Sequence, residues 1–207
     1  MEQEKSSSEI LKAFANKSGR SIHYIKSPYE ESYEHWVKRV WYQRKIYIPN
    51  NSSSSSFYVS YADAKSVNLN SENVLYSGVF IPLNLPLTAK ISIRKKDILD
   101  KINIFNRNKF LKSGFGHFDA KTTIRGNDTL SAQKLLKSRK VQDTILAAFH
   151  KEESLVAGVN IADTDFVPSL KKQSVLGIYS VSGWIFDAEL IEFLFERMEK
   201  IRKIVQQ

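Results

Sequence analysis

The sequence contains no cysteine, and this absence excludes several kinds of chemistry at once. Disulfide bonds, thiolate nucleophiles and zinc sites with sulfur ligands all need the side chain that is missing. A chain without cysteine fits a reducing compartment, although it does not require one. The 207 residues, 42% of them apolar, are enough to form a hydrophobic core without such cross-links.

Long hydrophobic runs are missing too. Crossing a bilayer takes about 20 consecutive apolar residues, and no run in this chain approaches that length. The first ten residues, M-E-Q-E-K-S-S-S-E-I, are polar and acidic, unlike a secretory signal. These features predict a soluble, cytoplasmic chain.

Motifs for catalysis and for cofactor binding are also absent. The sequence has no nucleophile elbow of the G-x-S-x-G type, no P-loop and no G-x-G-x-x-G turn. We therefore expect no catalytic residues and no cofactor.

Histidine is scarce, and only one histidine–acid pair suggests chemistry. The four histidines lack metal-ligand spacing such as H-E-x-x-H. His117 and Asp119 lie two residues apart in a segment that alternates like a strand, so they would point the same way and could hold a metal or form an acid–base couple. Because a further ligand or an orienting partner would be needed, an ordinary exposed or hydrogen-bonded pair is the favoured interpretation.

Positive charge is in excess. The net charge of +9 and the isoelectric point near 9.5 favour an anionic partner such as nucleic acid, acidic lipid or an acidic protein. Most of the excess lies in residues 90–125, where clustered cations can face phosphates or acidic headgroups, or can form a solvated rim. The predicted binding residues are Lys90, Arg94, Lys95, Lys96, Lys101, Arg107, Lys121 and Arg125.

A second cationic pattern lies in residues 35–48, the clearest strand of the first half. One face of this strand would interleave cations with aromatic side chains, as surfaces that stack single-stranded nucleic acid do. A solvent-facing strand whose aromatics cover cross-strand neighbours explains the same pattern, and no recognition-module signature accompanies it. The residues of this alternative nucleic-acid face are Arg39, Trp41, Lys45 and Tyr47.

The stretch from Phe115 to Phe149 is the most informative one for the fold. Residues 116–125 alternate as a strand does, and Gly126-Asn127 marks a turn. Asp128 and Ser138 are placed to cap two successive helices. The pattern predicts a strand followed by a broken helical pair.

The other predicted elements complete one domain. A helix over 8–17 forms an N-terminal appendage within residues 1–20, which either packs on the domain or continues an upstream segment. The last helix begins after Asp187. Its apolar stripe fits a coiled-coil seam, which would allow a weak homodimer, but the width of the stripe favours docking on the sheet. Further strands are expected at 21–25, 57–61, 74–81, 87–93, 154–161 and 174–181, a flexible serine-rich loop at 50–56, a turn-rich connection at 63–73, a brief helix after Asp97 and an extended segment at 165–168.

These elements predict an α+β fold for residues 21–207. Its antiparallel, meandering sheet would be followed by the helical pair after the 116–125 strand, with a C-terminal helix packed on one face.

Several motifs in the second half recur together in a known family. They are S-G-V-F at 77–80, F-D-x-K-x-x-I-x-G-x-D-x-x-x-A-x-x-L-L at 118–136, an aromatic-acidic segment near Phe166 and a closing I-x-x-L-x-x-x-M-x-x-I helix. From Ser77 onward the chain resembles an uncharacterised "domain of unknown function" family of bacterial membrane proteins, in which two transmembrane helices precede a cytosolic α+β domain. Ser138 stands where that family commonly has proline, and this sequence lacks the transmembrane pair.

The resemblance implies no established activity and supplies no catalytic residues. Combined with the charge pattern, it suggests a non-catalytic interaction domain at the cytosolic face of a membrane. We expect its basic surface to bind an acidic protein or anionic lipid, with nucleic-acid binding through the cation–aromatic strand as the alternative.

Overall fold

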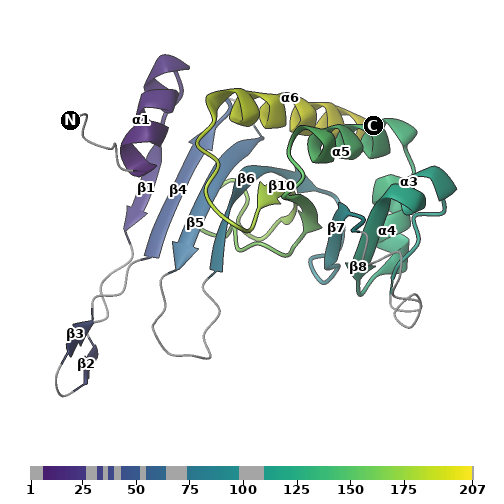
Figure 1. Cartoon of the computed structure of the whole chain (residues 1–207), viewed down its shortest axis with the longest axis horizontal. Coiled ribbons are helices and arrows are strands. Elements are labelled where there is room, and N and C mark those ends of the chain that lie inside the picture. Colours follow the sequence, from purple (N-terminus) through teal and green to yellow (C-terminus); the bar gives the residue numbers. More distant parts are fainter. Residues whose placement is uncertain are drawn as a thin grey trace.

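The computed structural model describes residues 7–26, 32–34, 37–39, 43–51, 55–63, 74–97 and 110–206 (Figure 1). The described helices are α1 (Ser7–Lys17), α3 (Gly116–Lys121), α4 (Thr129–Leu136), α5 (Arg139–Lys151) and α6 (Ala188–Val205). The described strands are β1 (His23–Lys26), β2 (Ser32–Glu34), β3 (Val37–Arg39), β4 (Gln43–Pro49), β5 (Phe57–Asp63), β6 (Val74–Leu83), β7 (Ile91–Lys95), β8 (Thr122–Gly126), β9 (Leu155–Val159) and β10 (Ser174–Ser180).

An eight-stranded antiparallel sheet organises these elements, in the order β1-β4-β5-β6-β10-β9-β7-β8. The predicted α+β class is confirmed. The meander holds only where β4, β5 and β6 pair in chain order. Strands β6 and β7 follow each other in the chain, but β10 and β9 lie between them, so the second half of the sheet is not a meander.

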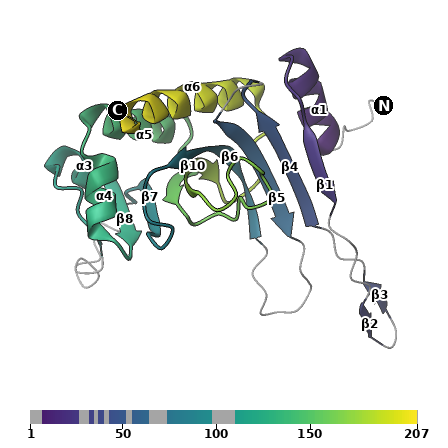
Figure 2. The ribbon, with the colours of Figure 1, turned by 180° about the vertical axis from the view of Figure 1, so that it is seen from behind.

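One face of the sheet is covered by α5 and α6, which run side by side along it in both views (Figures 1 and 2). The docked C-terminal helix is therefore confirmed, and its stripe is buried inside the chain as far as Ile201. Each fully buried aliphatic or aromatic side chain stabilises the fold by roughly 1.5–3 kcal/mol before entropy is counted. The homodimer through α6 stays a prediction, although the seam that suggested it is covered by the chain itself up to Ile201. The buried residues of α6 are Leu190, Ile191, Leu194, Phe195, Met198 and Ile201.

Helix α1 packs on the same core. Its buried residues Leu11, Phe14 and Ala15 belong to the cluster that contains the α6 stripe. Arg20, just after the helix, forms a two-pronged ion pair with Glu192 of α6 and donates from Nε to the carbonyl oxygen of Asn50 at 2.8 Å. The prediction that the N-terminal helix packs on the domain is therefore confirmed.

The opposite face of the sheet carries a second, aromatic core. It is covered by the connection between β9 and β10, residues 160–173, which contributes the buried side chains Val167 and Leu170. The extended segment predicted at 165–168 is wrong, because turn hydrogen bonds close this connection, among them Leu170 N to Val167 O at 2.9 Å. The aromatic members of this core are Phe57, Tyr61, Tyr76, Phe80 and Tyr179, with Tyr47 and Phe166 packed against them.

The predicted strand at 116–125 is wrong in its first half. Residues Gly116–Lys121 form helix α3, and the strand begins only at Thr122. Local hydrogen bonds explain the difference: the Asp119 carboxylate accepts from the backbone N–H of Ser113 at 3.0 Å, and Phe115 N–H donates to Ser113 Oγ at 3.0 Å. These bonds hold a helical turn, and the fully buried Phe118 anchors it.

The helical pair after this strand is confirmed. The Asp128 side chain accepts from the backbone N–H of Ser131 at 3.0 Å, as a capping residue does. Ser138 is the N-cap residue of α5, although its side chain makes no capping hydrogen bond. Asp187 caps α6 by accepting from Glu189 N–H at 2.9 Å.

The predicted strand at 35–48 is not continuous. Val37–Arg39 pairs with Ser32–Glu34 in a separate two-stranded sheet, whereas Gln43–Pro49 belongs to the main sheet. Strand β7 is also shifted, because it begins at Ile91 and not at residue 87. The predicted connection at 63–73 lies outside the described residues from 64 onward, and the brief helix after Asp97 falls in 98–109, also outside them.

Within the described residues, no helix has both the length and the hydropathy that crossing a bilayer requires.

Candidate anion-binding surface

The register of β7 and β8 decides which cations share a face. Ser92 lies opposite Arg125 and Arg94 lies opposite Thr123, so Arg94 and Arg125 are diagonal neighbours on one side of the ladder. Ile93 and Ile124 are opposite each other on the other side and are buried in the helix-covered core. Because side chains alternate along a strand, Arg94 and Arg125 project from the face that carries the aromatic core.

Hydrogen bonds extend this ladder beyond both ends of β7. Lys90 O accepts from Asn127 N–H at 3.1 Å, and Lys96 N–H donates to Lys121 O at 2.9 Å. Alternation therefore places Lys90 and Lys96 on the same side as Arg94. Lys96 also donates from Nζ to the carbonyl oxygen of Asp119 at 3.3 Å, which ties it to α3.

A segment beside β8 adds to this surface. Leu111 bridges to Ile124, with Leu111 N–H donating to Ile124 O at 2.9 Å. Its neighbours Phe110 and Lys112 consequently point to the outer side, where the Arg125 guanidinium lies 5.3 Å from the Phe110 ring centroid. We use the name basic face for Lys90, Arg94, Lys96, Lys112 and Arg125.

The other predicted binding residues have different positions. Lys95 points to the opposite side of β7 and forms an ion pair with Glu153. Lys121 ends α3, one residue before β8, and is exposed. Lys101 and Arg107 lie outside the described residues. The structure thus gathers four of the predicted residues and adds Lys112, which only the pairing of Leu111 with Ile124 could reveal.

Three exposed aliphatic residues lie on segments that border the start of β7. Leu87 is 57% exposed in the turn before β7, Leu130 is 78% exposed in the first turn of α4, and Ile161 is 48% exposed after β9. The register places the start of β7 beside the ends of β8 and β9. We call Leu87, Leu130 and Ile161 the apolar tip.

Two asparagines hold the turn that carries Leu87. Asn127 Nδ2 donates to Thr88 O at 2.9 Å, and its Oδ1 accepts from Lys90 N–H at 2.7 Å. On the other side, Asn160 Nδ2 donates to Ala89 O at 2.8 Å and to Pro86 O at 3.1 Å. Leu87 and Lys90 are therefore presented on a turn that is braced from both sides.

The alternative nucleic-acid face is not a single strand. Lys45 and Tyr47 lie on β4 with part-buried side chains. Lys45 Nζ is 5.5 Å from the ring centroid of Tyr61, and the rings of Tyr47 and His23 stack with their centroids 4.5 Å apart. Arg39 belongs to the separate two-stranded sheet, and Trp41 lies outside the described residues. Lys45 and Tyr47 thus border the aromatic core.

The geometric reason for pairing His117 with Asp119 is also wrong. Both residues lie on α3, where positions two apart point in different directions. His117 is exposed, whereas the Asp119 carboxylate accepts from Ser113 N–H. Among the residues that the structure describes, no three His, Cys, Asp or Glu side chains are grouped in a way that could hold a metal ion.

Buried tyrosines of both cores serve as hydrogen-bond donors or packing groups. Tyr58 OH donates to Ile185 O at 2.7 Å, and Tyr76 OH donates to Asp163 O. Burial raises the pKa of both hydroxyls, and it raises the pKa of Tyr179 to about 12. These groups therefore stay protonated at neutral pH, as structural side chains do.

Comparisons with known proteins found no matching family model, no matching curated protein and no matching solved structure.

Proposed function

We propose that this chain is a non-catalytic interaction domain that docks on an anionic membrane surface through the basic face and the apolar tip. The observation that carries the proposal is that five cations share one face of the sheet at its β7–β8 edge. They come from three segments that lie side by side there: β7, β8 and the residues around Leu111. Each lysine or arginine close to an anionic bilayer contributes about 1 kcal/mol to binding.

The apolar tip favours a membrane over other polyanions. A nucleic acid would neutralise the cations but would leave Leu87 and Leu130 in water. A bilayer interface accepts both, because its headgroups attract the cations while the acyl boundary takes aliphatic side chains. Lys90 lies three residues from Leu87 in the braced turn, so the two kinds of contact can form together.

This docking would place the domain at the cytosolic face of a membrane, as the resemblance of the sequence suggests. The basic face is the part of the surface that would lie against the headgroups. Helices α5 and α6 cover the other face of the sheet, so they would lie on the side of the molecule away from the bilayer (Figure 2).

Vesicle co-sedimentation tests the proposal. The protein is expected to bind vesicles of phosphatidylcholine mixed with phosphatidylglycerol at low salt, and to bind pure phosphatidylcholine vesicles weakly. A Lys90→Gln, Arg125→Gln variant removes two exposed cations of the basic face. At about 1 kcal/mol per cation, it should partition about thirtyfold more weakly into the acidic vesicles.

The matched control is a Lys17→Gln, Lys203→Gln variant, which removes the same charge from exposed positions on α1 and α6. It should lose much less binding. Equal binding of the unmodified protein to neutral and acidic vesicles contradicts the proposal, as does an equal loss in the two variants. Binding to a single-stranded oligonucleotide without binding to vesicles would assign the cations to nucleic acid instead.

A further inference from the structure

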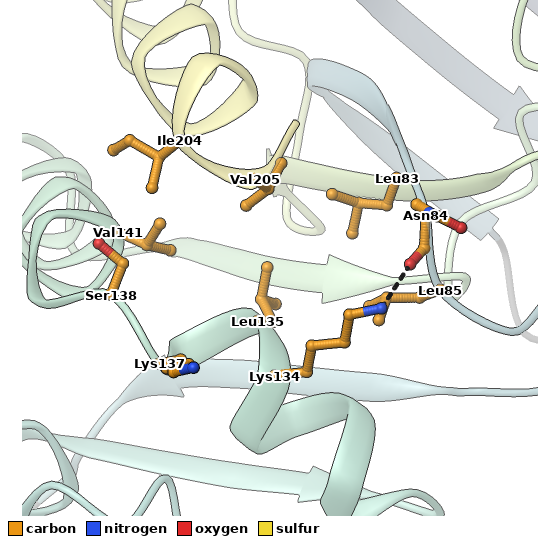
Figure 3. A pocket seen from close by; sticks show the side chains of 10 residues that line it. All are labelled: Leu83, Asn84, Leu85, Lys134, Leu135, Lys137, Ser138, Val141, Ile204 and Val205. Carbon is orange, nitrogen blue, oxygen red and sulfur yellow. Dashed lines mark hydrogen bonds between the residues drawn. The ribbon is translucent and has the colours of Figure 1, made fainter. Parts of the chain in front are cut away.

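A pocket of about 400 Å³ lies on the helix-covered side of the molecule, where α4, the start of α5, the end of α6 and the end of β6 meet (Figure 3). Its volume is within the range of roughly 300–1,000 Å³ that is typical of small-molecule sites. It is separate from the basic face, because Leu83 continues the side of β6 on which Val79 and Ile81 enter the helix-covered core.

Most of the pocket wall is aliphatic. Leu83 and Leu85 come from the end of β6 and the residues after it, and Ile204 and Val205 come from the last turn of α6. These four side chains are only partly buried, so they present apolar surface that the chain itself does not cover. Leu135 and Val141 complete the wall and are buried.

The mouth of the pocket is positively charged. Lys134 and Lys137 line it with exposed side chains, and Lys134 Nζ donates to Asn84 O at 3.3 Å (Figure 3). An ammonium group has three donors, so Lys134 can make this bond and still bind an anion. Among the described residues that line the pocket, none is acidic.

The start of α5 adds to this positive potential. A helix N-terminus carries a partial positive charge and is usually accompanied by acidic residues. Here the first turn of α5 contains no acid, and it begins with Arg139 and Lys140, separated from Lys137 only by the N-cap residue Ser138. The Ser138 hydroxyl, which lines the pocket, makes no capping hydrogen bond to the helix and can donate to a ligand instead.

We propose that this pocket binds a fatty-acid-like carboxylate, with the aliphatic chain against the leucine, isoleucine and valine side chains and the head group on Lys134 and Lys137. An aliphatic chain matches the wall, which removes it from water. A carboxylate matches the mouth, because it accepts charge-assisted hydrogen bonds from both ammonium groups. The aliphatic wall alone or the two lysines alone would fit many ligands. Together in one pocket they favour a ligand that has both an aliphatic chain and a carboxylate.

Isothermal titration of the full chain with three ten-carbon probes tests the assignment. Sodium decanoate, kept below its micelle-forming concentration, should bind at one site per chain. Decanol shares the aliphatic chain without the charge and should bind more weakly. Decyltrimethylammonium reverses the charge and should not bind measurably. Equal affinity for decanoate and decanol overturns the proposal, because the cations would then play no part.

Two variants locate the binding. Lys134→Gln, Lys137→Gln should weaken decanoate binding at least about tenfold, because a hydrogen bond to a charged group is lost, while decanol binding stays the same. Val205→Trp, at a partly buried wall position, should fill the pocket and abolish binding of both probes. The Lys17→Gln, Lys203→Gln variant is the charge-matched control and should bind decanoate as the unmodified protein does.

Unchanged decanoate binding in Val205→Trp, with the fold confirmed by circular dichroism, would place the ligand elsewhere and overturn the assignment. A dimer of the free protein that Val205→Trp dissociates would show that a second copy fills the pocket, with the same consequence. The outcome is independent of the proposed membrane docking, because that docking is measured with vesicles and with variants of the basic face.

Discussion

A single glycine, Gly158, lets an aromatic ring pack directly against the backbone of β9. The Tyr179 side chain lies across its neighbouring strand, and a Cβ atom added at Gly158 would be 2.6 Å from the tyrosine oxygen. Gly158 lies on β9 next to Val159, whose neighbours in the sheet are Leu176 and Ile91. Glycine at this position leaves room for the ring, and the ring covers the backbone that glycine exposes.

We predict that Gly158→Ala lowers the free energy of unfolding by about 1–3 kcal/mol, because the new methyl group forces the buried ring to move. In a Tyr179→Phe background the closest remaining contact of that methyl group is Cε1 at 3.0 Å, so the same change should cost less. Urea unfolding of the two single variants and the double variant measures the coupling. Additive effects would show that the oxygen of Tyr179 does not cause the strain.

At the scale of elements, local capping chemistry decides where helices begin in the stretch after β8. The Asp128 carboxylate accepts from Ser131 N–H at 3.0 Å and from Ser131 Oγ at 2.7 Å. These hydrogen bonds lower the pKa of Asp128 from its ordinary value of 3.8, and the bond from the backbone N–H of Ser131 contributes most. The charged form of Asp128 therefore stabilises the start of α4.

This stabilisation should depend on pH. The pKa of Asp128 is lower in the folded chain than in the unfolded one, so its contribution is present above pH 3.8 and is lost as the pH falls through the folded pKa. We predict that Asp128→Asn, which keeps an acceptor without the charge, is less stable than the unmodified protein at neutral pH and equally stable in acid. Urea unfolding over a series of pH values checks this.

Asp143→Asn is the control for the acid series, because Asp143 is an exposed acid within α5 that forms only a 3.8 Å ion pair with Arg139. Its difference from the unmodified protein should be small, since exposed pairs contribute little. A stability difference between Asp128→Asn and the unmodified protein that persists unchanged in acid would show that geometry, and not charge, explains the effect of Asp128.

At the scale of the whole molecule, the two proposed sites lie on opposite faces of the sheet and approach each other at one end. The segment after β6 starts at the pocket with Asn84 and Leu85, passes Leu87 of the apolar tip and reaches Lys90 of the basic face. Asn127 and Asn160 brace this segment from both sides. The end of the molecule that carries the tip is therefore the end that we expect to meet the bilayer.

We predict that Leu87→Ser, Leu130→Ser weakens vesicle partitioning at least about tenfold at both low and high salt, because the loss of two leucines removes apolar contact with the bilayer. Salt screens only the attraction of the basic face, so raising the salt should lower the binding of both proteins without removing the difference between them. A Val181→Ser variant, at an exposed position after β10, is the control and should bind normally. A difference that disappears at high salt, or an equal loss in the control, would exclude the tip as the inserted part.

Much of the fold was predictable because it depends on local patterns. The caps at Asp128 and Asp187, the buried stripe of α6 and the strands at β5, β6, β9 and β10 follow from periodicity and side-chain chemistry that act within a few residues. The segment at 116–121 alternates like a strand as well. It is a helix because Asp119 and Ser113 form hydrogen bonds that compete with the strand pattern.

The candidate sites were less predictable because they depend on pairing between distant segments. The charge count identified residues 90–125, but only the register of β7 with β8 shows that Arg94 shares a face with Arg125, while Lys95 points to the other side and binds Glu153. Leu87, Leu130 and Ile161 are single apolar residues in turns or in a helix, and nothing in their local sequence connects them. The pocket likewise combines side chains from four elements.

The sequence by itself determined the class of fold, the positions of most helices and the excess of positive charge, since composition and short-range periodicity are properties of the chain alone. Tertiary structure decided the order of the strands and, through it, which cations and leucines share a surface. The physical reason is that strand pairing joins segments that are far apart in the chain. Because β10 and β9 lie between β6 and β7, the residues next to β7 in the sheet come from β9 and β8 and not from β6.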